Sequence, residues 1–270
     1  PRNIKSLSNN DIRAIQEDLA GNLWLGTFGG GIKRLDKSSG DFRIFQHSSG
    51  NASSISSNYI NVITRDRNGD LWIGTRRGIN KLEPENSRFT SFQSLEPTAE
   101  DQQWANISSI LEDSKGRIWF GTFGGGLIQL DRRSGKMLNY QHDAKNPQSL
   151  SNNTVNGLSE EDGGNLWIAT SEGINILHLN TGEMQLVQNN PDNPNSLLNN
   201  DVHLLYRDRA GVIFIITADG INIYSKLSGR FRKFQKNPNE VKSLSSNAIN
   251  CFIEGPDGSI WIGTRDGLNR

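Results

Sequence analysis

A motif that recurs every 47 or 48 residues constrains the fold of this chain more than any other feature. The second copy reads Leu-Trp-Ile-Gly-Thr at residues 71–75, and an aromatic residue marks the same place in every copy. These anchors are Trp24, Trp72, Trp119, Trp167, Phe214 and Trp261. Self-similarity at such a period is typical of solenoids and propellers, in which each copy forms one supersecondary unit. The 270 residues therefore hold six copies of one unit.

Each copy contains four short apolar segments separated by turn signals. In the first copy these segments are residues 12–15, 23–27, 31–35 and 42–45. No segment sustains a 3.6-residue period over ten residues, so the pattern indicates strands. A four-stranded antiparallel sheet that repeats every 40–50 residues is typical of a β-propeller blade. We predict an all-β propeller with six repeats of about 47 residues.

The last repeat is incomplete, because the sequence reaches Arg270 within or just after its third strand. We therefore expect the chain to be an excerpt of a larger propeller, forming a single propeller region over residues 1–270. The predicted blades span approximately residues 8–46, 56–93, 104–141, 152–188, 199–235 and 246–270.

A polar turn precedes every anchor. Glycine lies three residues before the anchor in all six copies, as at Gly21 and Gly69. An acidic residue lies three positions earlier in five of them, with Gly255 as the exception. This order predicts a hairpin turn that the carboxylate caps and a glycine with positive φ closes. A catalytic or calcium-binding role is disfavoured, because the same carboxylate recurs on separate blades.

The anchor tryptophans are predicted to pack against the neighbouring blade, because every blade has one at the same strand position. Sugar stacking is the disfavoured alternative. The threonine that ends each anchor segment, as at Thr27 and Thr75, is predicted to form a local hydrogen bond.

Composition excludes several classes of protein. The chain has 29 basic and 29 acidic side chains, which argues against nucleic acid as a partner. Its longest apolar run, residues 212–216, is too short to span a membrane. The single cysteine, Cys251, excludes an internal disulfide and is predicted to be buried and inert. The four histidines lie apart in the sequence, so we predict no metal site, catalytic residue or cofactor.

Because successive strands run in opposite directions, the connections between them fall alternately on two opposite edges of each blade. The acidic and glycine turns fall on one edge, the turn edge. The loops between second and third strands, with the residues just before each first strand, fall on the other edge, the rim. The rim varies between copies, as expected of a binding surface on a regular scaffold. The candidate ligand-binding residues are Phe28, Tyr59, Arg76, Arg77, Trp104, Phe123, Glu172, Asp219, Arg265 and Asp266.

This mixture of aromatic, arginine and acidic side chains suits a polar ligand such as an oligosaccharide. For each of these residues taken singly, the alternative to a ligand-binding role is a place in an ordinary solvated loop. Arg76 and Arg77 are the sharpest candidates, because adjacent arginines can clamp an anionic group.

The repeat, with Ser-Leu-Ser-Asn-Asn before the first strand, Asp-x-x-Gly at the turn and Gly-Ile/Leu-x-x-Leu after the anchor, resembles the two-component regulator propeller family. The resemblance covers essentially the whole chain, with the fifth copy departing most at Phe214 and Ile216. It implies a periplasmic sensor domain of a bacterial hybrid histidine kinase or diguanylate cyclase. Several family members sense oligosaccharides. The resemblance also implies a full-length protein that is membrane-anchored and dimeric.

The first functional hypothesis is accordingly a non-enzymatic sensor that binds a small polar ligand. A protein-interaction scaffold that uses the same rim is the second hypothesis. A propeller lyase or glycosidase is the third, and clustered His, Tyr and Glu on one rim would support it.

Overall fold

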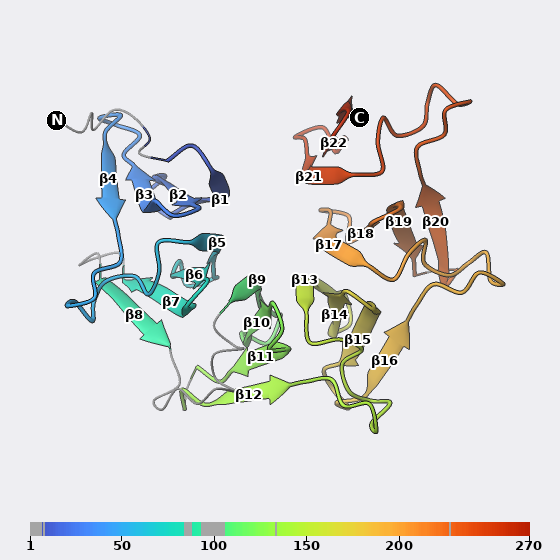
Figure 1. Ribbon diagram of the computed structural model, residues 1–270, viewed down its shortest axis with the longest axis horizontal. Coiled ribbons are helices and arrows are strands. Elements are labelled where there is room, and N and C mark those ends of the chain that lie inside the picture. Colours follow the sequence, from blue (N-terminus) through green and yellow to red (C-terminus); the bar gives the residue numbers. More distant parts are fainter. Residues whose placement is uncertain (1–6, 8, 84–87, 93–105, 133, 227) are drawn as a thin grey trace. The chain divides into compact units, whose positions relative to one another are not determined.

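The computed structural model describes residues 7, 9–83, 88–92, 106–132, 134–226 and 228–270, and the regular structure in these residues is entirely β-strand. The chain divides into two compact units, Pro1–Tyr140 and Gln141–Arg270. Each unit contains three consecutive antiparallel sheets whose strands pair in chain order (Figure 1).

The first unit contains blades one to three. Blade one consists of β1 (Ile12–Glu17), β2 (Leu23–Thr27), β3 (Gly31–Leu35) and β4 (Phe42–Phe45). Blade two consists of β5 (Ile60–Arg65), β6 (Leu71–Thr75), β7 (Gly78–Glu83) and β8 (Arg88–Phe92). Blade three consists of β9 (Ile107–Glu112), β10 (Ile118–Thr122), β11 (Leu127–Leu130) and β12 (Met137–Tyr140).

The second unit contains blades four to six. Blade four consists of β13 (Val155–Glu161), β14 (Asn165–Thr170), β15 (Gly173–His178) and β16 (Met184–Val187). Blade five consists of β17 (Val202–Arg207), β18 (Ile213–Thr217), β19 (Gly220–Ser225) and β20 (Arg230–Phe234). Blade six has three strands, β21 (Ile249–Glu254), β22 (Ile260–Thr264) and β23 (Gly267–Asn269). The predicted fold class, an all-β propeller of antiparallel blades with the last one incomplete, is confirmed.

Trp24 and Trp72 lie between neighbouring blades, as predicted for the anchor tryptophans. Trp24 is 3% exposed and shares a core with Ile60, Ile63 and Ile73 of blade two. Trp72 likewise packs on Phe120 of blade three, with their ring centroids 5.7 Å apart. Each indole therefore buries a large apolar surface at an interface between blades and is not available for stacking on a sugar.

The blades approach closely because β2 and β6 have glycine where the neighbour's isoleucine lies. A Cβ atom on Gly26 would lie 2.5 Å from Cγ2 of Ile60. A Cβ atom on Gly74 would lie 2.6 Å from Cγ2 of Ile107. The Gly in the anchor motif is therefore a packing requirement at these two interfaces between blades.

The turn edge follows the predicted hairpin chemistry. All six turn glycines have positive φ, from 77° at Gly258 to 89° at Gly69. In blade one, the Asp18 carboxylate accepts backbone N–H bonds from Ala20 (3.0 Å) and Asn22 (2.9 Å). The same carboxylate accepts the indole N–H of Trp24 at 2.8 Å. One acidic side chain thus closes the turn and fixes the anchor.

The same link recurs in blades two, three and four. The indole N–H groups of Trp72 and Trp119 donate to Asp66 and Asp113, both at 2.8 Å. Trp167 donates to Glu161 at 3.3 Å. The six threonines that end the anchor strands also behave as predicted, each donating its hydroxyl to the carbonyl of the glycine that follows the loop, as Thr27 does to Gly31 at 2.8 Å.

The prediction that Cys251 is buried is wrong, because this residue is exposed. In blades one and two its counterparts, Ala14 and Val62, lie against the cores that these blades share with the next blade. Leu268 on the same blade is 66% exposed, whereas its counterparts Ile32 and Ile79 are at most 2% exposed. This face of blade six thus lacks the cover that the corresponding faces of blades one and two have.

Candidate functional site

Neighbouring blades are joined at the rim by backbone hydrogen bonds. Phe28, in the loop after β2, forms an antiparallel bridge with Tyr59, which precedes β5. The N–H of Arg76 donates to the Tyr59 carbonyl at 3.1 Å. The loop after β2, the residue before β5 and the loop after β6 are therefore held side by side.

These backbone contacts bring three predicted ligand-binding residues into one stack. The Phe28 and Tyr59 rings meet edge to face, with centroids 5.0 Å apart. The Arg76 guanidinium carbon lies 4.5 Å from the Phe28 ring centroid and 5.1 Å from that of Tyr59. Tyr59 is 41% exposed, so part of its ring faces solvent. We call Phe28, Tyr59 and Arg76 the rim stack.

Arg13 also contacts the rim stack, although it was not among the predicted ligand-binding residues. Its guanidinium carbon lies 5.0 Å from the Phe28 ring centroid, and its Nε lies 2.8 Å from the Asp11 carboxylate. The pairing of β1 with β2 shifts register between Ile12 and Ala14, so Arg13 is the extra residue of a β-bulge. Bulges redirect side chains at strand ends. The residue pattern alone gives no signal of this bulge, which the structure shows as a register shift at the same end of the first strand in every blade.

Within the described part of the chain, no acidic side chain balances the charge of Arg76 in the rim stack. Arg76 is exposed, and among the described residues no carboxylate lies within 4.0 Å of its guanidinium. The neighbouring Arg77 is also exposed, and its backbone N–H donates to the Thr75 hydroxyl at 2.9 Å. Among the described residues, Arg76 is therefore the cation of the rim stack that lacks a carboxylate partner.

The remaining candidates of the first unit are not joined to the rim stack by any described contact. Phe123 in blade three is 47% exposed, and no ring or cation in the described part of the chain stacks on it. Its backbone N–H donates to the Asn106 carbonyl at 2.9 Å. Trp104 lies outside the described residues.

The rim candidates of the second unit are mainly acidic and engage local partners. Glu172 accepts a hydrogen bond from Asn152 at 3.3 Å, and Asp219 accepts one from Asn199 at 2.8 Å. Asp266 pairs with Lys236 at 3.4 Å. Arg265 is exposed, and its backbone N–H donates to the Ala248 carbonyl. Among the described residues no aromatic ring lies under its guanidinium, so the candidate site leaves it out. Each of these residues makes its contact within its own unit.

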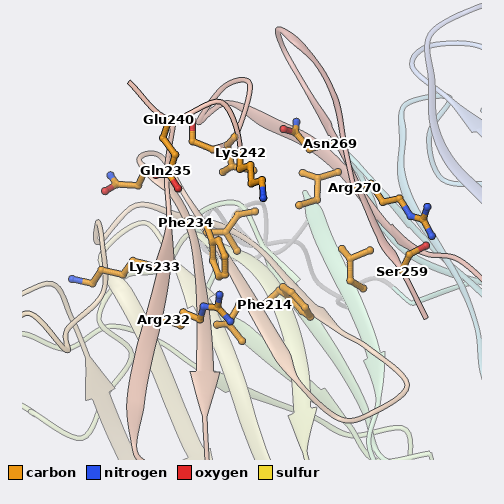
Figure 2. A pocket seen from close by; sticks show the side chains of 16 residues that line it. Phe214, Arg232, Lys233, Phe234, Gln235, Glu240, Lys242, Ser259, Asn269 and Arg270 are labelled. Carbon is orange, nitrogen blue, oxygen red and sulfur yellow. The ribbon is translucent and has the colours of Figure 1, made fainter. Parts of the chain in front are cut away.

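A cavity of about 660 Å³ lies between blades five and six of the second unit. Phe214 and Phe234 lie in its interior, and Lys233, Lys242 and Arg270 are among the side chains around them (Figure 2). Six of its lining residues are the counterparts of six residues in the core between blades one and two. They are Phe214, Ile221, Phe234, Leu244, Ile260 and Ile262.

In the core between blades one and two the counterparts of these residues pack against one another. The cavity is therefore part of the packing pattern between blades, and its apolar interior is explained without a ligand. We accordingly place the candidate site at the rim.

The histidines make structural contacts. Nδ1 of His47 lies 2.9 Å from the Ile55 carbonyl, and Nδ1 of His142 lies 2.7 Å from the Leu150 carbonyl. His178 contacts Asn165, and His203 contacts Asp201. Within the described residues no group of three or more His, Cys, Asp or Glu side chains could hold a metal ion.

Lys33 is a buried cation in blade one, where blades two, four and five have Asn80, Asn175 and Asn222. Burial lowers the pKa of the Lys33 ammonium. Asn80 accepts the backbone N–H of Ser56 at 2.9 Å. The residue that corresponds to Ser56 in the first repeat, Ser8, lies outside the described residues. Lys33 therefore occupies the strand position at which the asparagines of blades two, four and five bind the segment that precedes the first strand.

The shifted carboxyl groups lie on the turn edge and not at the rim. Burial raises the pKa of Asp113, but hydrogen bonds from Trp119 and Arg117 outweigh it and leave the pKa below its ordinary value. The pKa values of Asp18 and Glu161 are lowered for the same reasons. These groups are explained by turn and anchor contacts, which agrees with the predicted capping role.

Comparison with known proteins identifies the repeat. The family model described as "Two component regulator propeller" matches residues 6–29, 54–77, 102–124, 149–172 and 243–266. Five of the six repeats are therefore two-component regulator propeller repeats. Each matched segment runs from the polar lead through the anchor strand to the rim loop. The segment around Phe214 is left out, in keeping with its departure from the motif.

Solved structures show the same fold in longer proteins. The extracellular domain described as that of a hybrid two-component system, BT3049 of B. thetaiotaomicron, aligns with 97% of this chain at 23% identity and a TM-score of 0.69. A similar extracellular domain, BT4673 of the same organism, aligns at 20% identity and a TM-score of 0.60. The regulator propeller chain spans about 40% of the first of these structures and 39% of the second.

Structures with lower sequence identity share the fold but come from proteins with other roles. PorZ, a surface component of the type-IX secretion system of Porphyromonas gingivalis, is 18% identical over 96% of this chain and 38% of its own, with a TM-score of 0.71. Virginiamycin B lyase of Staphylococcus aureus is 14% identical over 95% of this chain and 78% of its own, with a TM-score of 0.67. No curated protein matches the chain in sequence. The described residues contain no helix long and apolar enough to cross a membrane.

Proposed function

We propose that this regulator propeller segment is a ligand-binding part of an extracytoplasmic sensor in a bacterial two-component or cyclic-di-GMP signalling receptor. The family match supports a signalling role, and the extracellular two-component domains of similar fold support the compartment. The observation that carries the proposal is the rim stack, in which Arg76 is held over Phe28 and Tyr59 without a carboxylate partner among the described residues.

Such a rim suits a polar ligand such as an oligosaccharide. Aromatic faces stack on the apolar side of sugar rings, and arginine donates hydrogen bonds to hydroxyl or acidic groups. The segment acts as a receptor domain and not as an enzyme in this proposal. Binding favours one state of a membrane-anchored dimer over another, because only a difference in affinity between two states shifts their populations.

The proposal predicts that a ligand stabilises the protein against heat. We expect one or more members of a panel of neutral and acidic oligosaccharides to raise the unfolding midpoint. A ligand at 100 times its dissociation constant adds about 2.7 kcal/mol. For a chain of this size that corresponds to a shift of about 5–10 °C. Differential scanning fluorimetry measures it.

The matched variants are the Arg76→Ala/Arg77→Ala double mutant, which is expected to lose the shift, and Arg265→Ala, which is expected to keep it. A panel that shifts neither the wild type nor any variant would count against ligand sensing. Capture of a defined periplasmic protein by the same rim would then favour the scaffold function.

A further inference from the structure

The rim stack differs from the rest of the described rim in having cations above aromatic rings. Arg13 and Arg76 both lie over Phe28, at 5.0 Å and 4.5 Å from its centroid. The acidic residue at this place, Asp11, is paired with Arg13 through contacts of 2.8 Å and 3.1 Å. Arg76 is therefore a cation without a described counterion, beside a second cation whose charge is already neutralised.

Stacking also orients the Arg76 guanidinium. A guanidinium held over aromatic rings is attracted by their negative faces, and the rings exclude water from one side of it. Its N–H groups lie in the guanidinium plane, where they match the two oxygens of a carboxylate or sulfate. The rim stack thus holds an oxyanion receptor in place before a ligand arrives.

The chain supplies an internal comparison at Arg265. Arg265 follows Thr264 as Arg76 follows Thr75, and its backbone N–H donates to Ala248 as that of Arg76 donates to Tyr59. Alanines stand in place of both aromatic residues, Ala218 for Phe28 and Ala248 for Tyr59. The two arginines share a loop position, but only Arg76 is held over aromatic rings.

Building on the proposed function, we infer that the rim stack binds the anionic group of an acidic saccharide, a sugar that carries a carboxylate or a sulfate. The Arg76 guanidinium takes the two oxygens of the anion. The exposed part of the Tyr59 ring, which is 41% accessible as a residue, contacts the apolar face of the sugar. Positive charge at this rim attracts the acidic ligand and is screened by salt.

The test compares two glycosides that differ only at C6, where one has a carboxylate and the other a hydroxymethyl group. Methyl β-D-glucuronide and methyl β-D-glucoside are titrated into the protein, with inorganic sulfate as a third probe, and binding is followed by NMR chemical shifts at low salt. The variants are Arg76→Ala, Arg76→Lys and Arg265→Ala. The changed side chains are exposed, and thermal unfolding of each variant verifies that it is folded.

We expect the glucuronide to bind at least about tenfold more tightly than the glucoside, since charge-assisted bidentate hydrogen bonds are the stronger ones. Arg76→Ala should abolish this preference, Arg76→Lys should retain part of it, and Arg265→Ala should leave it unchanged. The sulfate ion alone should bind more weakly than the glucuronide, because it lacks the sugar face.

Equal affinity for both glycosides would overturn this inference and leave the sensor proposal standing. Sulfate binding as tight as that of the glucuronide would overturn the contribution of the sugar. An equal loss in the Arg265→Ala variant would overturn the assignment to the rim stack. Failure of both glycosides to bind, together with an unshifted oligosaccharide panel, would overturn the inference and the proposed function together.

Discussion

Replacing Gly74 with valine is expected to lower the free energy of unfolding by about 3 kcal/mol, the upper end of what overpacking costs. A Cβ atom at this position would lie 2.6 Å from Cγ2 of Ile107 and 2.6 Å from Cγ1 of Val62. Ile107 belongs to the next blade and is fully buried, so it has no free space to move into. Valine therefore forces blades two and three apart. Urea unfolding followed by tryptophan fluorescence measures the change.

The matched control is Gly50→Ala. No heavy atom lies within 4 Å of the place where its Cβ would be, and Gly50 has no positive φ. We expect Gly50→Ala to change stability by less than about 1 kcal/mol, and in the stabilising direction, because alanine restricts the unfolded chain. A Gly74→Val protein as stable as Gly50→Ala would contradict the close packing of these two blades.

Replacing Asp113 with alanine is expected to cost about 3 kcal/mol of stability. Its side chain is fully buried and accepts the indole N–H of Trp119 at 2.8 Å and the backbone N–H groups of Lys115 and Arg117, both at 2.9 Å. Alanine leaves several of these donors without an acceptor, and a buried donor left unpaired costs about 1–3 kcal/mol. Chemical denaturation at pH 7 measures the loss, with the exposed Asp192→Asn as the control variant.

The same carboxylate predicts how stability depends on pH. Burial raises the pKa of Asp113, but its hydrogen bonds outweigh burial and lower the pKa from the ordinary 3.8. A group with a lowered pKa in the folded state adds stability above its unfolded pKa and loses it as the pH falls through the folded one. The difference in stability between wild type and Asp113→Asn should therefore shrink between pH 7 and pH 3. A difference that stays constant or grows would contradict this account.

The fold could be predicted from the sequence because the same anchor position and the same turn recur from blade to blade. Trp24 and Trp72 recur at one strand position, which only a shared packing role explains, and the structure places both between blades. The turn glycines have positive φ because the hairpin requires it. What the pattern did not show is that Asp18 also holds the Trp24 indole, since six residues separate them and the turn must form before they meet.

The rim was predicted less completely because its contacts depend on register. Phe28, Tyr59 and Arg76 were selected individually, and the backbone bridge between Phe28 and Tyr59 brings them together. Arg13 was missed because a bulge in β1, invisible in the residue pattern alone, directs it to the Phe28 ring. Cys251 was wrongly predicted to be buried, because its exposure depends on what covers that face of blade six and not on its own strand.

Our central claim is that the rim of blades one and two is the ligand-binding surface and that the turn edge is scaffold. Hydrogen exchange measured by mass spectrometry, with and without a pooled hydrolysate of neutral and acidic polysaccharides, tests this claim most directly. We predict slower exchange at residues 27–31, 58–60 and 75–78 and unchanged exchange at the turns 18–22, 66–70 and 113–117. Protection at the turns, at the cavity residues 232–244, or at no segment would contradict it.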